Sequence, residues 1–358
     1  MAQIAKAGLK TILKPSTKTI FSGIQPTGIP HLGNYLGALK GWVDQQNEAE
    51  ESTNLIYSLV DLHAVTIKQD PDQLRKWRRE SLAVLLAIGL DPKRSTIFFQ
   101  SHVPAHSELM WILSCTASVG YLSRMTQWKS KLSLGDSARP FDTPLQLGLF
   151  SYPVLQAADI LVHRATHVPV GQDQVQHLEF ARDCAGSFNA VYGKVLVEPE
   201  TVLSPARKIM SLKFPGKKMS KSDPSQDSRI LLTDTEIDIQ RKVKMAFTDS
   251  LDGDLEYDPQ TRSGIANLID IWYHLQGSNG ESIQDAMKWM RTYNKKALKE
   301  HVASSIDKSI APIRGRYQEL MSGSNEQYLN DVAEEGAVKA ATSANATLTE
   351  VKKAMGLL

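Results

Sequence analysis

Short apolar segments alternate with amphipathic segments from residue 19 to about residue 207, and this alternation is the feature that most constrains the fold. The expected strands lie at residues 17–23 (TKTIFSG), 54–65 (NLIYSLVDLHAV), 95–104 (STIFFQSHVP) and 166–174 (THVPVGQDQ). The segments between them show helical spacing. Residues 69–90, for example, open with Asp-Pro and close at a glycine. Alternation of this kind predicts an α/β fold, in which helices cover both faces of a Rossmann-like parallel sheet.

The character of the chain changes after residue 226, where β-branched runs become rare and helical patterns dominate. Good helix formers continue to the end of the chain and predict one long final helix. We therefore expect five parts, over residues 1–18 (a basic leader), 19–207 (the Rossmann-like domain), 208–225 (a lysine-rich loop), 226–330 (a smaller helical domain) and 331–358 (the C-terminal helix).

The loop after the first expected strand has the composition of a phosphate-binding turn. Residues 21–34 (FSGIQPTGIPHLGN) contain three glycines and two prolines and run directly into a helix. Glycine permits close approach of the backbone to a ligand, and a helix N-terminus favours anions. We expect His31 and Asn34 to contact phosphate or ribose oxygens and Gly33 to leave room for a purine. The alternative is an ordinary strand–turn–helix connection.

Three lysines and two serines lie between a Pro-Gly turn and an Asp-Pro turn within residues 214–227 (FPGKKMSKSDPSQD). One interpretation is a solvated surface loop. The other is a loop that closes over a polyphosphate, and this interpretation requires a partner motif elsewhere in the chain. Residues 21–34 supply that partner, because ligands of parallel sheets bind at the carboxyl ends of the strands.

Together, HLGN at residues 31–34 and KMSKS at residues 218–222 resemble the HIGH and KMSKS signatures of class I aminoacyl-tRNA synthetases. Further blocks in order along the chain narrow the resemblance to the tryptophanyl-tRNA synthetase family: FSGIQPTG, GNYLGAL, VDLHA, YPVLQAADIL, VPVGQDQ, IMSL and KKMSKSDP. The resemblance extends from about Thr19 to the C-terminus. The basic leader and HLGN are similar to the fungal mitochondrial branch.

The resemblance implies a ligase that activates L-tryptophan with ATP and transfers it to tRNA(Trp). Lysines of the KMSKS loop would neutralise the leaving pyrophosphate. The implied catalytic residues are Lys218, Ser220, Lys221, Gln25 and Lys129. The implied ATP-binding residues are Gln25, Pro26, Thr27, His31, Gly33, Asn34, Gly171, Gln172, Asp173, Ile209, Lys218, Met219, Ser220, Lys221 and Ser222. The implied tryptophan-binding residues are Phe21, Gly23, Val60, His63, Tyr152, Gln156, Asp159, Val170 and Gln174.

Asp159 is the residue expected to recognise the indole ring. Indole offers one donor, and a carboxylate is only an acceptor, so a buried Asp159 would separate tryptophan from phenylalanine. The alternative is an acid on a helix surface, which its apolar neighbours in AADIL disfavour. The alternative role for Tyr152 and His63 is packing in the core. The alternative for Lys129 is an ordinary solvated charge at the surface.

Two positions depart from the family pattern. Gln156 stands where bacterial members often carry methionine, and this substitution makes that edge of the pocket more polar. Gln172 stands where glutamate is common, which makes the region near ATP one charge less negative. Neither change removes a group to which the resemblance assigns a necessary role.

The charge distribution separates the leader from the rest of the chain. No acidic residue precedes Asp44, while Lys6, Lys10, Lys14 and Lys18 recur at four-residue spacing. Removing these four charges from the net charge of +2 leaves −2. The leader therefore predicts an organelle transit peptide and a place in the mitochondrial matrix. The alternatives are a disordered basic tail and a cytoplasmic protein.

Composition narrows the partners further. No apolar run approaches the ~18–20 residues that span a membrane. Cys115 and Cys184 stand far apart, and we expect two buried thiols in a reducing compartment. No histidine pair forms a zinc motif, so we predict that Mg²⁺ arrives with ATP and that the protein builds no metal cage of its own.

The helical domain is expected to read the anticodon. Its candidate contacts with tRNA phosphates are Arg291, Lys295, Lys296 and Lys299, although a solvated helical face carries the same residues. The resemblance also implies a homodimer. Two other functions stay open: an HxGH-type nucleotidyltransferase that makes a dinucleotide or cofactor, and a non-catalytic RNA-binding relative such as a splicing factor.

Overall fold

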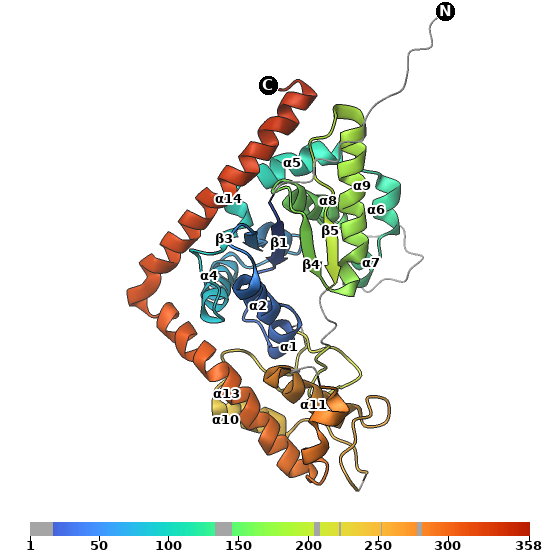
Figure 1. The fold of residues 1–358 in the computed structure, drawn as a ribbon, viewed down its shortest axis with the longest axis vertical. Coiled ribbons are helices and arrows are strands. Elements are labelled where there is room, and N and C mark those ends of the chain that lie inside the picture. Colours follow the sequence, from blue (N-terminus) through green and yellow to red (C-terminus); the bar gives the residue numbers. More distant parts are fainter. Residues whose placement is uncertain (1–16, 133–144, 204–207, 222, 252, 278–280) are drawn as a thin grey trace, which may run out of the picture.

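Five parallel strands form one sheet in the order β3-β2-β1-β4-β5 (Figure 1). The computed structural model describes residues 17–132, 145–203, 208–221, 223–251, 253–277 and 281–358. The strands are β1 (Thr19–Ile24), β2 (Asn54–Leu59), β3 (Thr96–Phe99), β4 (His167–Val170) and β5 (Glu200–Leu203). All four neighbouring pairs are parallel, which confirms the predicted Rossmann-like α/β class.

The sheet has a hydrophobic core on each face because successive strand residues point to opposite sides. Ile20 of β1 packs on one side with helices α2 and α4, while Phe21 packs on the other side with α5, α8 and α9. The helices of this half of the chain are α1 (Leu32–Asn34), α2 (Lys40–Glu48), α3 (Asp61–Ala64), α4 (Pro71–Ala87), α5 (Ala105–Ser114), α6 (Val119–Arg124), α7 (Gln127–Lys131), α8 (Leu147–Leu161) and α9 (Val175–Tyr192).

Helix α4 shows how local sequence sets the ends of an element. The side chain of Asp70 accepts a 2.8 Å hydrogen bond from the Gln73 amide, and Pro71 occupies the first turn. Gly89 follows the helix with a φ of +109°, a conformation that side chains with a Cβ rarely adopt. The predicted start and end of this helix are therefore confirmed.

Three local features differ from the sequence-based expectations. The helix after His31 contains a π-helical turn at Tyr35–Leu39 between α1 and α2. Strand β5 was not predicted, because its residues are mostly exposed and form no apolar run. The expectation of two buried thiols is wrong for Cys115, which is exposed at the end of α5, and right for Cys184.

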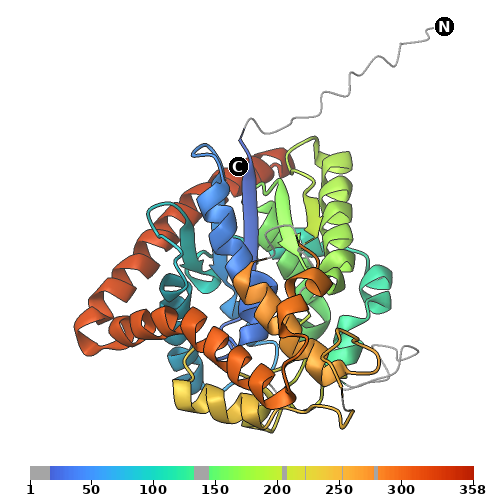
Figure 2. The same ribbon diagram turned by 60° about the horizontal axis from the view of Figure 1, so that its bottom comes forward.

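The last part of the chain is helical and packs against the same core. Its helices are α10 (Glu236–Lys244), α11 (Ser263–Gln276), α12 (Ile283–Ala286), α13 (Lys295–Met321) and α14 (Glu326–Met355). In Figure 2 the helices of this part, yellow to orange, lie at the front in the lower half of the molecule. One hydrophobic cluster continues from Leu82 of α4 to Ile306 of α13, so the helical part shares its core with one face of the sheet.

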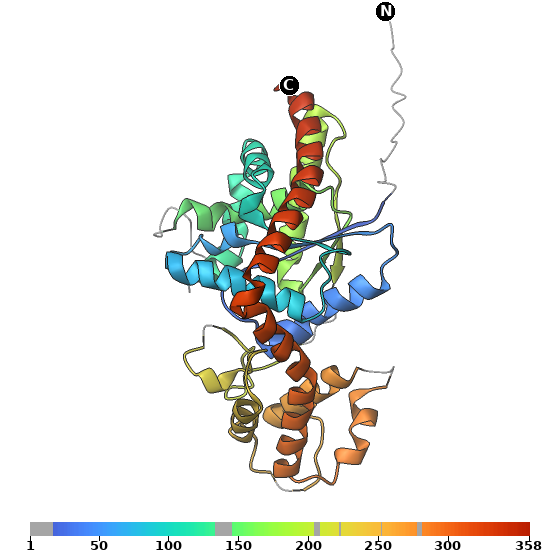
Figure 3. The ribbon, with the colours of Figure 1, turned by 90° about the vertical axis from the view of Figure 1, so that its left-hand side faces the viewer.

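Helix α14 wraps around the edge strand β3, and the prediction of a long final helix is confirmed. Figure 3 shows it running from the helical part of the chain up along the sheet. Val332 belongs to the core on one face of the sheet, whereas Ala344 belongs to the core on the other. The crossing occurs at Gly336, where an added Cβ would lie 1.8 Å from the carbonyl oxygen of Ile97.

Replacing Gly336 with Ala is therefore expected to lower the free energy of unfolding by about 1–3 kcal/mol, because a methyl group cannot fit between α14 and the β3 backbone. Chemical denaturation of the two proteins measures the difference. The matched control is Gly315→Ala, on the exposed side of α13, where an added Cβ meets nothing within 4 Å. That change should stabilise the protein by about 0.5–1 kcal/mol. Equal effects at both sites would contradict the close packing of α14.

Candidate active site

The loop that follows β1 is held by its own side chains. His31 caps α1: its Nδ1 accepts a 3.2 Å hydrogen bond from the Asn34 amide, while the His31 amide donates to Asn34 Oδ1 at 3.2 Å. Burial and the nearby charges of Lys221 and Arg229 lower the pKa of His31 to about 4. The imidazole is thus neutral near pH 7 and adds no positive charge to the site.

The lysine-rich segment forms a small hairpin. Met210 and Lys218 pair as an isolated antiparallel bridge, and the Met219 amide donates to the Ile209 carbonyl at 3.0 Å. Asn267 on α11 fixes the base of the hairpin, because its amide group both accepts from the Met210 amide and donates to the Met210 carbonyl. The helical part of the chain therefore positions the KMSKS loop.

This hairpin converges on the loop after β1. Lys221 Nζ donates a 2.7 Å hydrogen bond to the carbonyl of Gly28, a residue 193 positions away. The chain just beyond the lysine loop continues the contact, since the Leu32 amide donates to the Ile230 carbonyl at 2.8 Å. Met219 Cβ lies 3.5 Å from the position that a Cβ on Gly33 would take. The two signature segments thus form one site.

Asp159 lies at the carboxyl ends of β2 and β3, in helix α8, and is only 1% exposed. Its Oδ1 accepts from Gln100 Nε2 at 2.6 Å and from His106 Nδ1 at 2.7 Å, and its Oδ2 accepts from His63 Nε2 at 2.8 Å. Burial alone would raise the pKa of Asp159, but the hydrogen bonds and charges of His106 and His63 outweigh it and lower the pKa. The carboxylate is therefore ionised at neutral pH.

A second hydrogen-bonded group lines α8 beside this carboxylate. The Tyr152 hydroxyl donates to Gln127 Oε1 at 2.9 Å and also lies 2.9 Å from His177 Nε2. Gln127 in turn donates to the Asp173 carbonyl at 3.0 Å. Gln174 Nε2 donates to the Asp173 carboxylate at 3.0 Å. Tyr152 and Gln174, two of the residues predicted to bind tryptophan, are therefore linked through Gln127 and Asp173.

The other residues predicted from the sequence lie on several elements of this half of the chain and on the hairpin. Gly23 touches Val60, since an added Cβ would lie 2.9 Å from Val60 Cγ1. Gln156 donates to Gln174 at 3.2 Å, and Lys129 is buried on α7 with its ammonium 5.6 Å from the Trp128 ring. Ser222 lies outside the described residues. The remaining predicted residues lie within or just after β1 and β4 or belong to the hairpin: Phe21, Gln25, Pro26, Thr27, Val170, Gly171, Gln172 and Ser220.

Sequence analysis missed several residues of the site. Gln100 and His106 were not assigned to Asp159, and His163 was considered only as a metal ligand. Gln100 could have been identified by its position, because it directly follows β3 and ligands of parallel sheets bind at the carboxyl ends of the strands. Among the described residues, no group of three or more histidine, cysteine, aspartate or glutamate side chains is arranged to hold a metal ion. No helix within the described ranges is long and apolar enough to cross a membrane.

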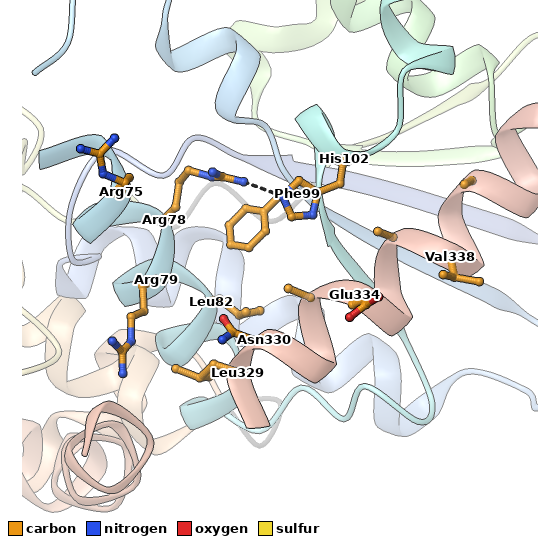
Figure 4. A pocket seen from close by; sticks show the side chains of 13 residues that line it. Arg75, Arg78, Arg79, Leu82, Phe99, His102, Leu329, Asn330, Glu334 and Val338 are labelled. Carbon is orange, nitrogen blue, oxygen red and sulfur yellow. Dashed lines mark hydrogen bonds between the residues drawn. The ribbon is translucent and has the colours of Figure 1, made fainter. Parts of the chain in front are cut away.

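A cavity of about 560 Å³ lies where α4, the end of β3 and α14 meet (Figure 4). One of its lining side chains is Arg78, whose guanidinium lies 4.4 Å above the Phe99 ring and 2.9 Å from His102 Nε2. The other side of Arg78 forms a 3.0 Å ion pair with Asp61, the first residue of α3. Arg78 thus braces the short helix that carries His63.

The family model of class I tRNA synthetases (W and Y) matches residues 14–311. The mitochondrial tryptophan–tRNA ligase of Schizosaccharomyces pombe is 44% identical, with 99% of both chains covered. The mitochondrial tryptophan–tRNA ligase of Saccharomyces cerevisiae is also 44% identical and covers 95% of this chain and 91% of its own.

Solved structures match over the same span. A tryptophanyl-tRNA synthetase from Mycoplasma pneumoniae superposes with a TM-score of 0.81 at 29% identity, covering 95% of this chain and 98% of its own. A tryptophanyl-tRNA synthetase from Campylobacter jejuni, complexed with ADP and tryptophan, has a TM-score of 0.77 at 30% identity and covers 94% and 99%. The fold of this chain thus matches that of tryptophanyl-tRNA synthetases over nearly its whole length.

Proposed function

This chain belongs to the class I tRNA synthetases of the W and Y family, and we propose that it is a mitochondrial ligase that joins L-tryptophan to tRNA(Trp). The observation that carries the choice of amino acid is Asp159, a fully buried carboxylate at the strand ends. An ionised acceptor in an apolar pocket favours a large ring with one N–H donor. The 44% identity to two mitochondrial tryptophan–tRNA ligases supports the same function.

The first step activates the amino acid. The tryptophan carboxylate attacks the α-phosphorus of ATP, tryptophanyl-AMP forms, and pyrophosphate leaves. The chain supplies no nucleophile; its part is to position the reactants and to stabilise negative charge. The loop after β1 and the hairpin of Lys218 and Lys221 enclose the phosphates, and closure of the hairpin brings positive charge to the leaving pyrophosphate.

The second step transfers the amino acid. The terminal ribose hydroxyl of tRNA attacks the carbonyl carbon of tryptophanyl-AMP, and AMP leaves with the bond to phosphate broken. The helical part of the chain would bind the anticodon, with Arg291, Lys295, Lys296 and Lys299 as candidate phosphate contacts. Lys295 and Lys299 donate hydrogen bonds to backbone carbonyls of the helical part. Arg291 and Lys296 are more exposed and form surface ion pairs, with Asp254, Glu256 and Glu300.

Three features of the assembled enzyme belong to the same proposal. Mg²⁺ would enter with ATP and remain mainly on phosphate oxygens. Two copies of the chain would form a homodimer. The basic leader would direct the protein to the mitochondrial matrix; most of it, residues 1–16, lies outside the described residues.

Tryptophan-dependent exchange of pyrophosphate into ATP tests the proposed function. We expect exchange with tryptophan and none with tyrosine or phenylalanine. Exchange with tyrosine instead would show that the chain activates tyrosine, the other amino acid of the W and Y family. Exchange without any amino acid would favour a nucleotidyltransferase, and RNA binding without exchange would favour a non-catalytic relative.

The pH dependence of activation follows from Lys221. Burial lowers the pKa of its ammonium to about 8. Because the charged form contacts phosphate, kcat/KM for ATP should fall as the pH rises through about 8 and level off below it. Pyrophosphate exchange measured across this range gives the profile. In the Lys221→Arg variant the guanidinium stays charged, so the alkaline decline should disappear. An unchanged profile in that variant would assign the decline to another group.

A further inference from the structure

The two oxygens of Asp159 are unequally occupied. Oδ1 accepts hydrogen bonds from both Gln100 and His106, whereas Oδ2 accepts one, from His63. Each carboxylate oxygen offers two lone pairs. Oδ1 is therefore saturated, and Oδ2 retains one lone pair. If Asp159 recognises indole, as the proposed function requires, the N–H must approach Oδ2.

A chain of buried hydrogen bonds leads away from the saturated oxygen. His106 Nε2 lies 3.3 Å from His163 Nε2, and His163 Nδ1 lies 3.2 Å from the hydroxyl of Ser343 on α14. Both histidines are at most 3% exposed. We call His106, His163 and Ser343 the histidine chain. It joins the carboxylate to a helix that begins far beyond the catalytic half of the sequence.

The direction of the first hydrogen bond follows from the carboxylate. Asp159 can only accept, so His106 must donate from Nδ1. If His106 Nε2 carries no proton, His163 donates to it from Nε2 and accepts from Ser343 at Nδ1; if it carries one, both bonds reverse, and the chain is complete either way. Burial lowers the pKa of His163 well below its ordinary value and keeps this ring neutral.

Gln100 is oriented by a separate contact. The backbone amide of Leu62 donates to Gln100 Oε1 at 3.1 Å. The side-chain amide must therefore turn its NH₂ group toward Asp159. Gln100 is fully buried, so no water competes for this arrangement. Oδ1 is thus held from two directions by donors whose own orientation is set by the protein.

We propose that Gln100 and the histidine chain are positioning groups for tryptophan recognition: they hold Oδ1 of Asp159 so that the free lone pair of Oδ2 faces the indole N–H. The C-terminal helix α14 thereby takes part in amino-acid selection through Ser343. A purely structural role, in which the same groups only neutralise a buried charge, would affect stability but not the preference for an N–H donor.

The test uses tryptophan and its isostere 3-(benzothiophen-3-yl)alanine, in which sulfur replaces the N–H. Calorimetry gives the dissociation constant of the isostere divided by that of tryptophan. This ratio measures the contribution of the N–H. His106→Leu removes the Nδ1 donor and should lower the ratio about tenfold to a hundredfold. His106→Asn places an amide NH₂ near Nδ1 and should largely restore it. If His106→Leu weakens both ligands equally, the proposal is wrong.

A milder pair of variants tests the far end of the chain, where folding is less at risk. Ser343→Ala should lower the same ratio about twofold to tenfold. The matched control is Thr342→Ala, the neighbouring hydroxyl on the exposed side of α14, which bonds to Val338 of its own helix. An unchanged ratio in Ser343→Ala would remove α14 from the proposal. Pyrophosphate exchange by the unmodified enzyme reports separately on the proposed function.

Discussion

Replacing Lys221 with Ala is expected to lower the rate of tryptophanyl-AMP formation by about 10²- to 10³-fold, while the dissociation constant for tryptophan stays nearly unchanged. Lys221 joins the two signature segments through its 2.7 Å hydrogen bond to the Gly28 carbonyl. Under the proposed function, its ammonium would face the pyrophosphate that leaves ATP. Charge that is placed in advance stabilises the transition state more than the bound substrates.

Single-turnover measurement of tryptophanyl-AMP formation, together with calorimetry of tryptophan binding, separates the two effects. Lys217→Ala is the matched control, because Lys217 is an exposed lysine of the same hairpin. We expect its activation rate to remain close to that of the unmodified enzyme. An unchanged rate in Lys221→Ala would exclude the proposed role of the loop. An equal loss of rate in Lys217→Ala would show that the loop acts only through its overall positive charge.

Replacing Asp159 with Asn should lower kcat/KM for tryptophan by about 10²- to 10³-fold. Three donors, from Gln100, His106 and His63, point at the carboxylate. The asparagine amide has one acceptor oxygen, so at least one of these donors must face an NH₂ group. The pocket then loses its charge and the fixed orientation of its acceptor, although its volume is nearly the same.

The isostere that lacks the N–H shows whether this loss concerns recognition. Its kcat/KM should change much less than that of tryptophan, because it makes no hydrogen bond to Asp159. Asp183→Asn, the same substitution at an exposed position of α9, is the matched control and should leave both values unchanged. Equal losses for both amino acids in Asp159→Asn would indicate a collapsed pocket instead of lost recognition. Thermal unfolding of the variant would show such a collapse directly.

Most of the sheet could be predicted from the sequence. Buried parallel strands appear as continuous apolar runs, and β1, β2 and β3 have this character. Strand β5 escaped prediction because its exposed edge carries polar residues such as Glu200. The start of a helix was equally predictable where a capping residue such as Asp70 directly precedes it, because that interaction is local.

The candidate site was only partly predictable. The apolar neighbours of Asp159 in the sequence indicated burial, and the structure buries it. Its partners Gln100 and His106 could not be identified, because they come from another strand end and another helix. Which side chains reach a buried carboxylate depends on how far each helix is rotated and shifted against the sheet, and no local pattern records those quantities.

The parallel α/β architecture and the two candidate phosphate-binding segments could be predicted from the sequence, because apolar periodicity, glycine turns and clustered lysines act over a few neighbouring residues. The tertiary structure alone decided that Lys221 meets Gly28, that Gly336 lets α14 cross β3 and that Ser343 reaches His163, 180 positions away. Contacts at such separations form only after whole elements have packed, since their energy comes from shape and partner geometry and not from the neighbours of each residue along the chain.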